Sequence, residues 1–181
     1  MKTHRVITII GWLVSGILLF LWQEKYLPFH YEYIEQFRLF HYSADYFIEH
    51  CSYPSGIIEY LGSFLIQFFN QPHVGAGIVT ILLLSVGIGI QQIFKRIASH
   101  VDMPLAYLLP TLFLLFAGMD INYHLEGTLA FALSVWFLNI QVSFVRPVHR
   151  MISGVLLSWA LYYLAGPAFA LFALCSVIYE W

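Results

Sequence analysis

Acidic and histidine side chains are concentrated in two short stretches of an otherwise apolar sequence. The first stretch contains Asp45, Glu49, His50 and Glu59, and the second contains Asp120, His124 and Glu126. Clustered carboxylates repel one another unless a cation, a shared proton or a basic partner compensates them. Two compensations would support chemistry: a divalent cation held by carboxylate oxygens, or a carboxyl group that exchanges a proton with a substrate. The spacing matches no known metal motif, so both remain open.

Individual residues in the first stretch allow more specific expectations. Asp45 and Glu49 are four residues apart and would share one face of a helix. Arg38 could bind a phosphate group, although an ion pair with Glu35 explains it equally well. Each acid also has an ordinary explanation as the wet face of a surface helix.

In the second stretch, Asp120 and His124 are expected at membrane ends, where polar caps are normal. Glu126 is expected just inside an apolar segment, and a carboxylate there is costly to place in lipid. Asp45 and Asp120 are the candidate catalytic residues, and Arg38, Glu49, His124 and Glu126 are the candidate substrate-binding residues. The choice of Asp45 and Asp120 among the acids rests on the family resemblance described below. A metal, if one is used, would be a divalent cation held by Asp45 and Asp120.

The composition sets the class of protein that must position these side chains. Of the 181 residues, 60% are hydrophobic and only 10% are charged, and the mean hydropathy is +0.77. Soluble domains contain about 25% charged residues, and disordered chains lack apolar groups, so the chain is predicted to be a polytopic membrane protein. The net charge of −2 provides no positive field for nucleic acid.

Apolar runs predict a single membrane domain over residues 1–181, all-α, with about six transmembrane segments. They are expected at 6–22, 74–94, 104–119, 125–145, 151–165 and 167–179. The last two are separated at Gly166-Pro167, which a helix cannot pass without a kink. Between the first two spans, the outer loop 23–73 is expected to form helices near 31–49 and 57–70, both lying at the membrane interface.

The basic residues predict the orientation of the chain. With a cytoplasmic N-terminus, only Lys25 and Arg38 would lie outside. The six that would lie inside are Lys2, Arg5, Lys95, Arg96, Arg146 and Arg150. The positive-inside rule favours this arrangement, which makes the loop 23–73 periplasmic if the membrane is a bacterial inner membrane.

Several short strings in the outer loop carry a family resemblance. They are Glu35-Gln36-Phe37, Leu39-Phe40, Asp45-Tyr46-Phe47, Pro54, Gly56, Tyr60-Leu61-Gly62 and Gln67-Phe68-Phe69. Through them, residues 30–75 resemble an uncharacterised family of polytopic membrane proteins from Bacteroidota. The order of spans and acidic outer loops is similar to the N-terminal part of the GT-C fold of membrane glycosyltransferases.

The GT-C resemblance implies a function for the acidic stretches. Such enzymes use polyprenyl-phosphate-linked donors, and the acid of their first outer loop, here Asp45, acts as general base or helps to hold a metal. Further acids of the second outer turn correspond to Asp120 and Glu126. The chain departs from the pattern because it has no Asp-x-Asp pair and about half the expected spans. With no polar tail after Glu180-Trp181, a fragment of a longer protein is expected.

Three functions follow for this bilayer-embedded chain. The first is a GT-C-like glycosyltransferase, or its N-terminal portion, that uses a polyprenyl-phosphate-linked sugar on the periplasmic face. The second is a non-catalytic scaffold or accessory subunit whose acidic rim is merely solvated. An ion or proton transporter is less favoured, because transport usually requires ionisable groups near the bilayer midplane.

Overall fold

The computed structural model describes residues 2–36, 39–97 and 107–180, and every element in these ranges is a helix. Four stretches are long and apolar enough to cross a membrane: Val6–Tyr26, Pro72–Ile97, Leu125–Ser143 and Pro147–Glu180. The expectation of an all-helical protein with apolar helices suited to a bilayer is confirmed, whereas the expected count of about six spans is not supported.

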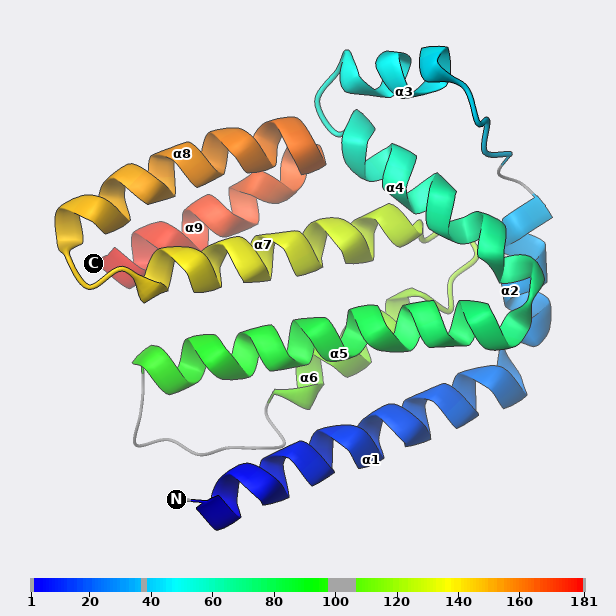
Figure 1. The fold of residues 1–181 in the computed structure, drawn as a ribbon, viewed down its shortest axis with the longest axis horizontal. Coiled ribbons are helices and arrows are strands. Elements are labelled where there is room, and N and C mark those ends of the chain that lie inside the picture. The colour runs from blue at the N-terminus through cyan, green and yellow to red at the C-terminus, as the bar shows by residue number, and fades with distance from the viewer. Residues whose placement is uncertain (1, 37–38, 98–106, 181) are drawn as a thin grey trace.

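Three long helices lie side by side (Figure 1). They are α1 (Lys2–Tyr26), α5 (Pro72–Ile97) and α7 (Leu125–Ser143), and α5 lies between the other two and contacts both. The shorter α6 (Leu108–Ala117) packs against α5. Its 10 residues rise about 15 Å, half of a hydrocarbon core of about 30 Å. The described part of the span expected at 104–119 is therefore too short to cross a bilayer. Residues 104–106 lie outside the described residues.

The last apolar stretch turns back on itself. Helix α8 (Pro147–Ala165) is followed by a 3-10 turn, η2 (Gly166–Ala168), and by α9 (Phe169–Glu180), which returns along α8 (Figure 1). Gly166 has a φ of +56°, a left-handed conformation that glycine adopts without steric cost. At the other end of the hairpin, Arg150 Nε lies 2.8 Å from Glu180 Oε1. The break expected at Gly166-Pro167 is thus present, although its 12-residue second arm is too short to count as a separate span.

The segment between α1 and α5 contains two helices where one was expected over 31–49. Helix α2 (Pro28–Gln36) and helix α3 (Ala44–Cys51) are separated by non-helical residues at 39–43. The Ser43 hydroxyl accepts a hydrogen bond from the backbone N–H of Tyr46 at 3.2 Å. A serine in this position caps a new helix by satisfying a free N–H group. The apolar periodicity continues through the break, which explains why the sequence pattern suggested one helix.

The second loop helix packs into the protein. Helix α4 (Gly56–Ile66) and the 3-10 turn η1 (Gln67–Asn70) occupy the expected range 57–70. Helix α4 contacts α3, α7 and α8, and Ile58, Ser63 and Ile66 on it are buried. Its inner face is therefore covered by neighbouring helices, in addition to any contact it makes with the membrane interface.

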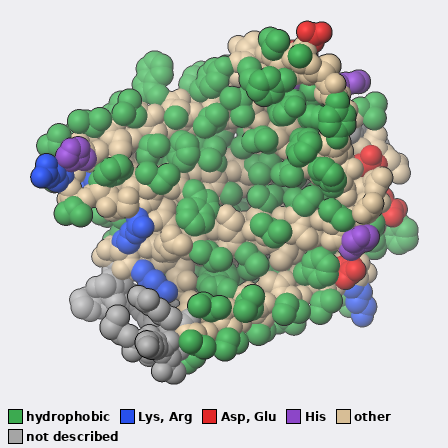
Figure 2. Space-filling view, viewed as in Figure 1, with side chains coloured by type: hydrophobic (Ala, Val, Ile, Leu, Met, Phe, Trp, Pro, Cys, Tyr) green, Lys and Arg blue, Asp and Glu red, His purple; other side chains and the backbone are tan. Residues whose placement is uncertain are grey.

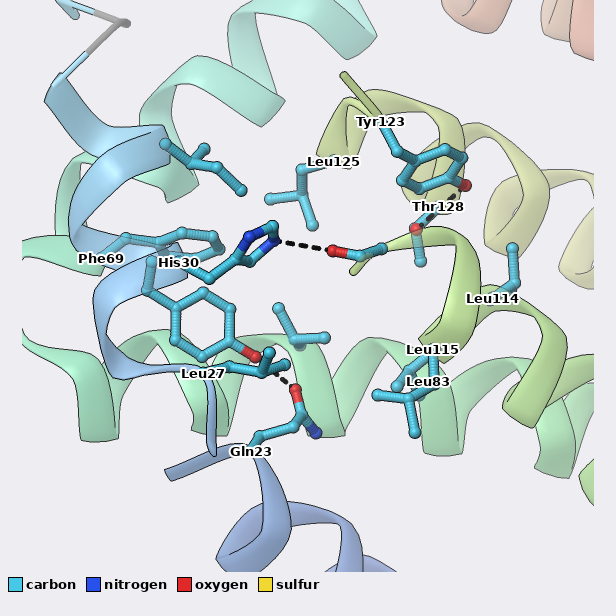
Figure 3. A pocket seen from close by; sticks show the side chains of 14 residues that line it. Gln23, Leu27, His30, Phe69, Leu83, Leu114, Leu115, Tyr123, Leu125 and Thr128 are labelled. Atoms are coloured by element: carbon cyan, nitrogen blue, oxygen red, sulfur yellow. Dashed lines mark hydrogen bonds between the residues drawn. The ribbon is translucent and has the colours of Figure 1, made fainter. Parts of the chain in front are cut away.

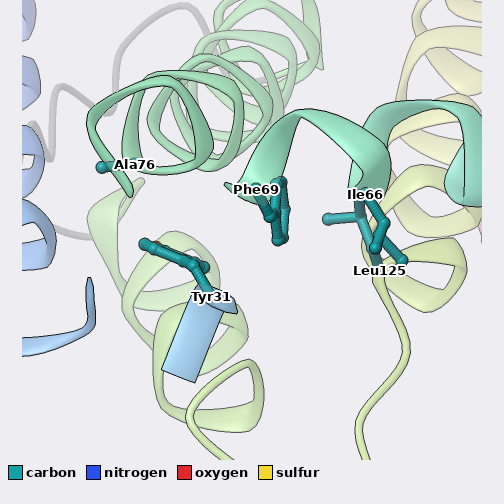
Figure 4. Close-up of a cluster of buried hydrophobic side chains, with 5 residues drawn as sticks. All are labelled: Tyr31, Ile66, Phe69, Ala76 and Leu125. Carbon is teal, nitrogen blue, oxygen red and sulfur yellow. The ribbon is translucent and has the colours of Figure 1, made fainter. Parts of the chain in front are cut away.

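A cluster of buried side chains packs the segment between α1 and α5 against the long helices (Figure 4). Tyr31 of α2 meets Phe69 of η1 edge to face, with ring centroids 5.0 Å apart. Ile66, Ala76 and Leu125 complete the cluster from α4, α5 and α7. Complete burial of one such side chain contributes about 1.5–3 kcal/mol, so α2 and η1 are held firmly at this end of the molecule.

Charged side chains separate toward the two ends of the helices (Figure 2). Lys95 and Arg96 lie in the last turn of α5, and Arg150 lies near the start of α8. The opposite end carries α2, α3 and α4 with most of the acids, and Lys25 at the end of α1 is a basic exception there. The molecule thus has a basic end and an acidic end.

Candidate functional site

A pocket of about 310 Å³ opens at the acidic end of the molecule. It lies between α2, the end of α4 and the turn that joins α6 to α7. Its walls are formed by Tyr33, Ile34, Ile66, Ile121, Asn122, Tyr123, His124 and Leu125. The volume falls at the lower end of the range for small-molecule sites, about 300–1,000 Å³. We call this hollow the surface pocket.

The turn beside the surface pocket is shaped by Asp120. Its Oδ1 accepts hydrogen bonds from the backbone N–H of Asn122 at 2.9 Å and from Asn122 Nδ2 at 3.2 Å. Aspartate commonly stabilises a turn in this way, through the backbone two residues ahead. The Asp120 side chain is exposed, so its carboxylate fixes the turn and also faces solvent next to the pocket.

Glu126 lies in the first turn of α7, one residue beyond the pocket wall at Leu125, and only 7% of it is exposed. Helix α4 approaches it through Gly62, where an added Cβ would lie 2.6 Å from Glu126 Cγ. The positive end of a helix dipole favours a carboxylate in this position. Burial thus distinguishes Glu126 from the exposed acids of this end.

A smaller cavity, of about 40 Å³, adjoins the surface pocket. Figure 3 shows the side chains that line it. The two hollows share Ile34, Tyr123 and Leu125 as lining residues. The volume is sufficient for a water molecule, which also needs two to four polar partners. Polar side chains are present around the cavity on Gln23, His30, Tyr31, Tyr123 and Thr128.

Hydrogen bonds from these polar side chains link α1, α2, α5 and the end of α6. The Tyr31 hydroxyl donates to Gln23 Oε1, and Gln23 Nε2 donates to Thr80 Oγ1 at 2.9 Å. His30 Nε2 donates to the Gly118 carbonyl at 2.8 Å, which joins α2 to the end of α6. Burial raises the pKa of the Tyr31 phenol well above its ordinary value, so this group remains a neutral donor.

The cavity network was not predicted from the sequence. The signal was present, because Gln23 directly follows an apolar run in which a polar residue is costly. The run was expected to end at residue 22, whereas α1 continues to Tyr26. Gln23 is consequently inside the protein, with none of its surface exposed.

The fold brings only some of the predicted site residues together. His124 lines the surface pocket, Asp120 shapes its turn, and Glu126 is buried behind it. Asp45 and Glu49 lie exposed on α3, which packs on α4 and is not one of the elements that line the pocket. Arg38 lies outside the described residues.

Glu59 and its neighbours stabilise the connection between α3 and α4. The Glu59 carboxylate accepts hydrogen bonds from the Tyr53 hydroxyl at 3.0 Å and the Ser55 hydroxyl at 2.7 Å. Burial, together with this hydrogen bond and the negative charge of Glu59, raises the pKa of Tyr53 to about 12. The Ser55 N–H donates to the Tyr163 carbonyl at 3.0 Å, so the connection also binds to the end of α8. Glu59 therefore has a structural role.

A metal site is not formed by the described residues. Within 2–36, 39–97 and 107–180, no three His, Cys, Asp or Glu side chains are grouped so that they could hold an ion. A divalent cation shared by Asp45 and Asp120 consequently receives no third ligand of this kind from the described part of the chain. The polar groups of the surface pocket are suited to hydrogen bonding instead.

Comparison with known proteins places the chain in a family. The model for a family of unknown function, DUF6057, matches residues 3–181, so the chain belongs to this family. No curated protein and no solved structure matches the chain.

Proposed function

We propose that this member of the DUF6057 family is a GT-C-like membrane glycosyltransferase, or the N-terminal portion of one. In this proposal the acidic end of the molecule faces the periplasm of a bacterial inner membrane. The substrate is a sugar carried on polyprenyl phosphate, which reaches the protein from the bilayer.

The observation that carries the proposal is the surface pocket. It combines hydrogen-bonding groups on Asn122, Tyr123 and His124 with apolar walls from Ile34 and Ile66. Sugar hydroxyls require such donors and acceptors, and the apolar side suits a substrate that enters from lipid. An exposed carboxylate, Asp120, lies in the turn that joins α6 to α7, and a buried one, Glu126, lies in the first turn of α7.

The proposed reaction assigns the proton transfer to a carboxylate. Asp120 accepts the proton of the acceptor hydroxyl, whose oxygen forms a bond to the anomeric carbon of the sugar. The bond from that carbon to the phosphate oxygen breaks, and the polyprenyl phosphate leaves with the electron pair. Asp120 is preferred to Asp45 because it adjoins the pocket, whereas Asp45 lies on α3.

The orientation is supported by the charge separation. Lys95, Arg96 and Arg150 gather at one end, where α5 ends and α8 begins. Basic residues close to transmembrane helices favour the cytoplasmic side. We infer that this end is cytoplasmic, together with the start of α1, and that the surface pocket opens outward.

One observation favours the second candidate, a non-catalytic scaffold or accessory subunit. The Asp120 carboxylate already stabilises the turn that contains it, because it accepts two hydrogen bonds from Asn122. A purely structural aspartate would be bonded in the same way. The two functions therefore predict different effects on sugar transfer for a substitution at Asp120 that preserves the turn.

The substitution that separates them is Asp120→Asn, which retains the accepting Oδ1 but removes the base. Membranes containing the full-length protein and its native acceptor are incubated with short-chain polyprenyl phosphates carrying radiolabelled glucose, galactose or mannose. Since proton transfer contributes about 10²–10⁴-fold to a rate, Asp120→Asn should lower sugar transfer at least a hundredfold without changing thermal stability.

Asp45→Asn is the matched variant, because it neutralises an exposed acid outside the pocket. Transfer at the rate of the unmodified protein is expected for it. Loss of transfer in Asp45→Asn alone would assign the base to α3. Full transfer in both variants would contradict the assignment of the base to either aspartate. If the unmodified protein gives no more transfer than membranes without it, the glycosyltransferase proposal is contradicted and the scaffold function is left.

A further inference from the structure

Helix α1 is flanked by two apolar grooves and forms one edge of the molecule (Figure 1). One groove, of about 610 Å³, lies between α1 and α5, and we call it the α1–α5 groove. The other, of about 760 Å³, lies between α1 and α6, and we call it the α1–α6 groove. Most large side chains of α1, including Leu13 and Leu18, are exposed.

A single charged group distinguishes the two grooves. Lys25 lies in the last turn of α1 and lines the α1–α6 groove, beside Trp22 and Tyr26. This part of the groove is the one nearest the acidic end of the molecule. Among the described residues, the side chains that line the α1–α5 groove are uncharged, and they include Trp12 and Gln91. Tryptophan and tyrosine are typical of the depth at which lipid headgroups begin, so Lys25 lies where a lipid phosphate would be.

The length of the α1–α6 groove suits one lipid leaflet. Along α1 it extends from Ser15 to Tyr26, which at 1.5 Å per residue is about 16 Å. Half of a hydrocarbon core of about 30 Å is nearly the same. An acyl chain of ordinary length would fill this distance, whereas a long polyprenyl chain would extend well beyond it.

We propose that the α1–α6 groove binds an anionic phospholipid, with one acyl chain along the groove and the phosphate against the Lys25 ammonium. The wall opposite α1 is supplied by α6, through Leu112, Leu115 and Phe116. Glu24 precedes Lys25 in the chain but does not line the groove, so the cation is the charge presented to the headgroup. The site is independent of the proposed transferase activity.

The test uses tryptophan fluorescence, because each groove contains its own reporter. Two variants of the full chain are placed in nanodiscs, one with Trp22 and the other with Trp12 as the only tryptophan. Each disc contains phosphatidylcholine with a small fraction of dibrominated lipid, either phosphatidylglycerol or phosphatidylcholine. Bromine quenches a nearby indole, so the ratio of the two quenching efficiencies measures headgroup preference independently of depth.

The expected result is a preference for the brominated anionic lipid at Trp22 and none at Trp12. One lysine near a membrane surface corresponds to a preference of about fivefold. Lys25→Gln, at an exposed position, should abolish it. Equal preference at both reporters, or a preference that survives Lys25→Gln, would overturn the proposal. So would the absence of quenching at Trp22 by either lipid, which would mean that another protein surface covers the groove.

A second measurement does not depend on the tryptophan substitutions. Native mass spectrometry of the otherwise unmodified chain, released from mixed phosphatidylglycerol and phosphatidylcholine, should retain one anionic lipid. Lys25→Gln should lose it. Retention of both lipids in proportion to their supply would overturn the proposal, as would exclusive retention of added short-chain polyprenyl phosphate.

Discussion

Helices α1 and α7 are both long enough to cross a bilayer, yet the protein uses them in opposite ways. In the apolar window of α1 only 11% of the residues are buried, against 56% in that of α7. Over their apolar stretches, α1 is the more apolar of the two, and it lies at the edge. Among the described side chains, α7 buries more polar residues than α1. It lies between α5 and the α8–α9 hairpin.

The difference follows from the solvent around the helices. In lipid, a polar group that finds no partner is costly, so polar side chains turn toward other helices. Thr128, Ser134, Asn139 and Gln141 are buried on α7. On α1, the buried polar side chain among those that the structure describes is Gln23. In this molecule polarity, more than apolarity, therefore selects the helix that becomes the centre.

The largest expected effect comes from filling the contact between α5 and α7. A Cβ added at Gly89 would lie 2.7 Å from Val135 Cγ1. Gly89→Leu should force the two helices apart, with a loss of about 3 kcal/mol or more in the free energy of unfolding. The measurement is thermal unfolding in detergent micelles.

The matched control is Gly11→Leu, since a Cβ at Gly11 meets nothing within 4 Å. It should change stability by less than about 0.5 kcal/mol. Comparable losses in the two variants would contradict the contrast between a packed α7 and a lipid-facing α1.

A smaller effect is expected where α4 meets the start of α7. Gly62→Ala places a methyl group against Glu126, whose carboxylate is held at the first turn of α7. Overpacking of this kind costs about 1–3 kcal/mol, and it should also displace Glu126 from behind the surface pocket. Denaturation by sodium dodecyl sulfate measures the stability change.

Gly16→Ala provides the comparison on α1. There the added Cβ would lie 2.8 Å from Leu84 Cδ1, the mobile end of a side chain that can rotate away. We expect a loss smaller than that for Gly62→Ala. A larger loss at Gly16 would show that α1 is held more tightly than its exposure indicates.

The smallest effects come from single hydrogen bonds between helices. Asn139 Nδ2 donates to Gln92 Oε1 at 3.0 Å and to the Gly89 carbonyl at 3.2 Å. Asn139→Leu should cost about 1–2 kcal/mol, the upper part of the range measured for such bonds in membranes. Loss of this side chain from α7 should lower the midpoint of thermal unfolding.

Trp12→Phe removes the corresponding bond of α1, from Trp12 Nε1 to Gln91 Oε1 at 3.0 Å. The expected loss is about 0.6 kcal/mol, the average for interhelical hydrogen bonds. A larger loss of stability for Trp12→Phe than for Asn139→Leu would show that the edge helix α1 depends on polar contacts as much as the central helix α7.

Much of the helix pattern could be predicted from apolar runs and breakers. The runs at 74–94 and 125–145 correspond to α5 and α7, and Gly166-Pro167 separates α8 from α9. The break between α2 and α3 was missed, because a serine cap leaves little trace in an unbroken apolar periodicity. The count of about six spans is not supported, because four helical stretches of the described residues are long and apolar enough to cross a membrane.

Only the part of the candidate site that comes from the second acidic stretch could be predicted from the sequence. His124 and Glu126 belong to one turn, so their proximity follows from the chain itself. The pairing of Asp45 with Asp120 depended on two loops meeting, and it remains a prediction, since α3 does not line the pocket. Gln23, Tyr31 and Thr80 come from three different helices, and nothing in their spacing indicates that they meet.

Taken alone, the sequence determined the class of protein, its all-helical character and its separation of charge. These properties follow from local composition, because apolar runs of sufficient length favour lipid and basic residues avoid translocation. Tertiary structure decided which helix is central, which acids are buried, and where a pocket opens. Those outcomes depend on side-chain contacts between distant segments, such as Gly62 against Glu126, and local composition does not encode which surfaces will meet.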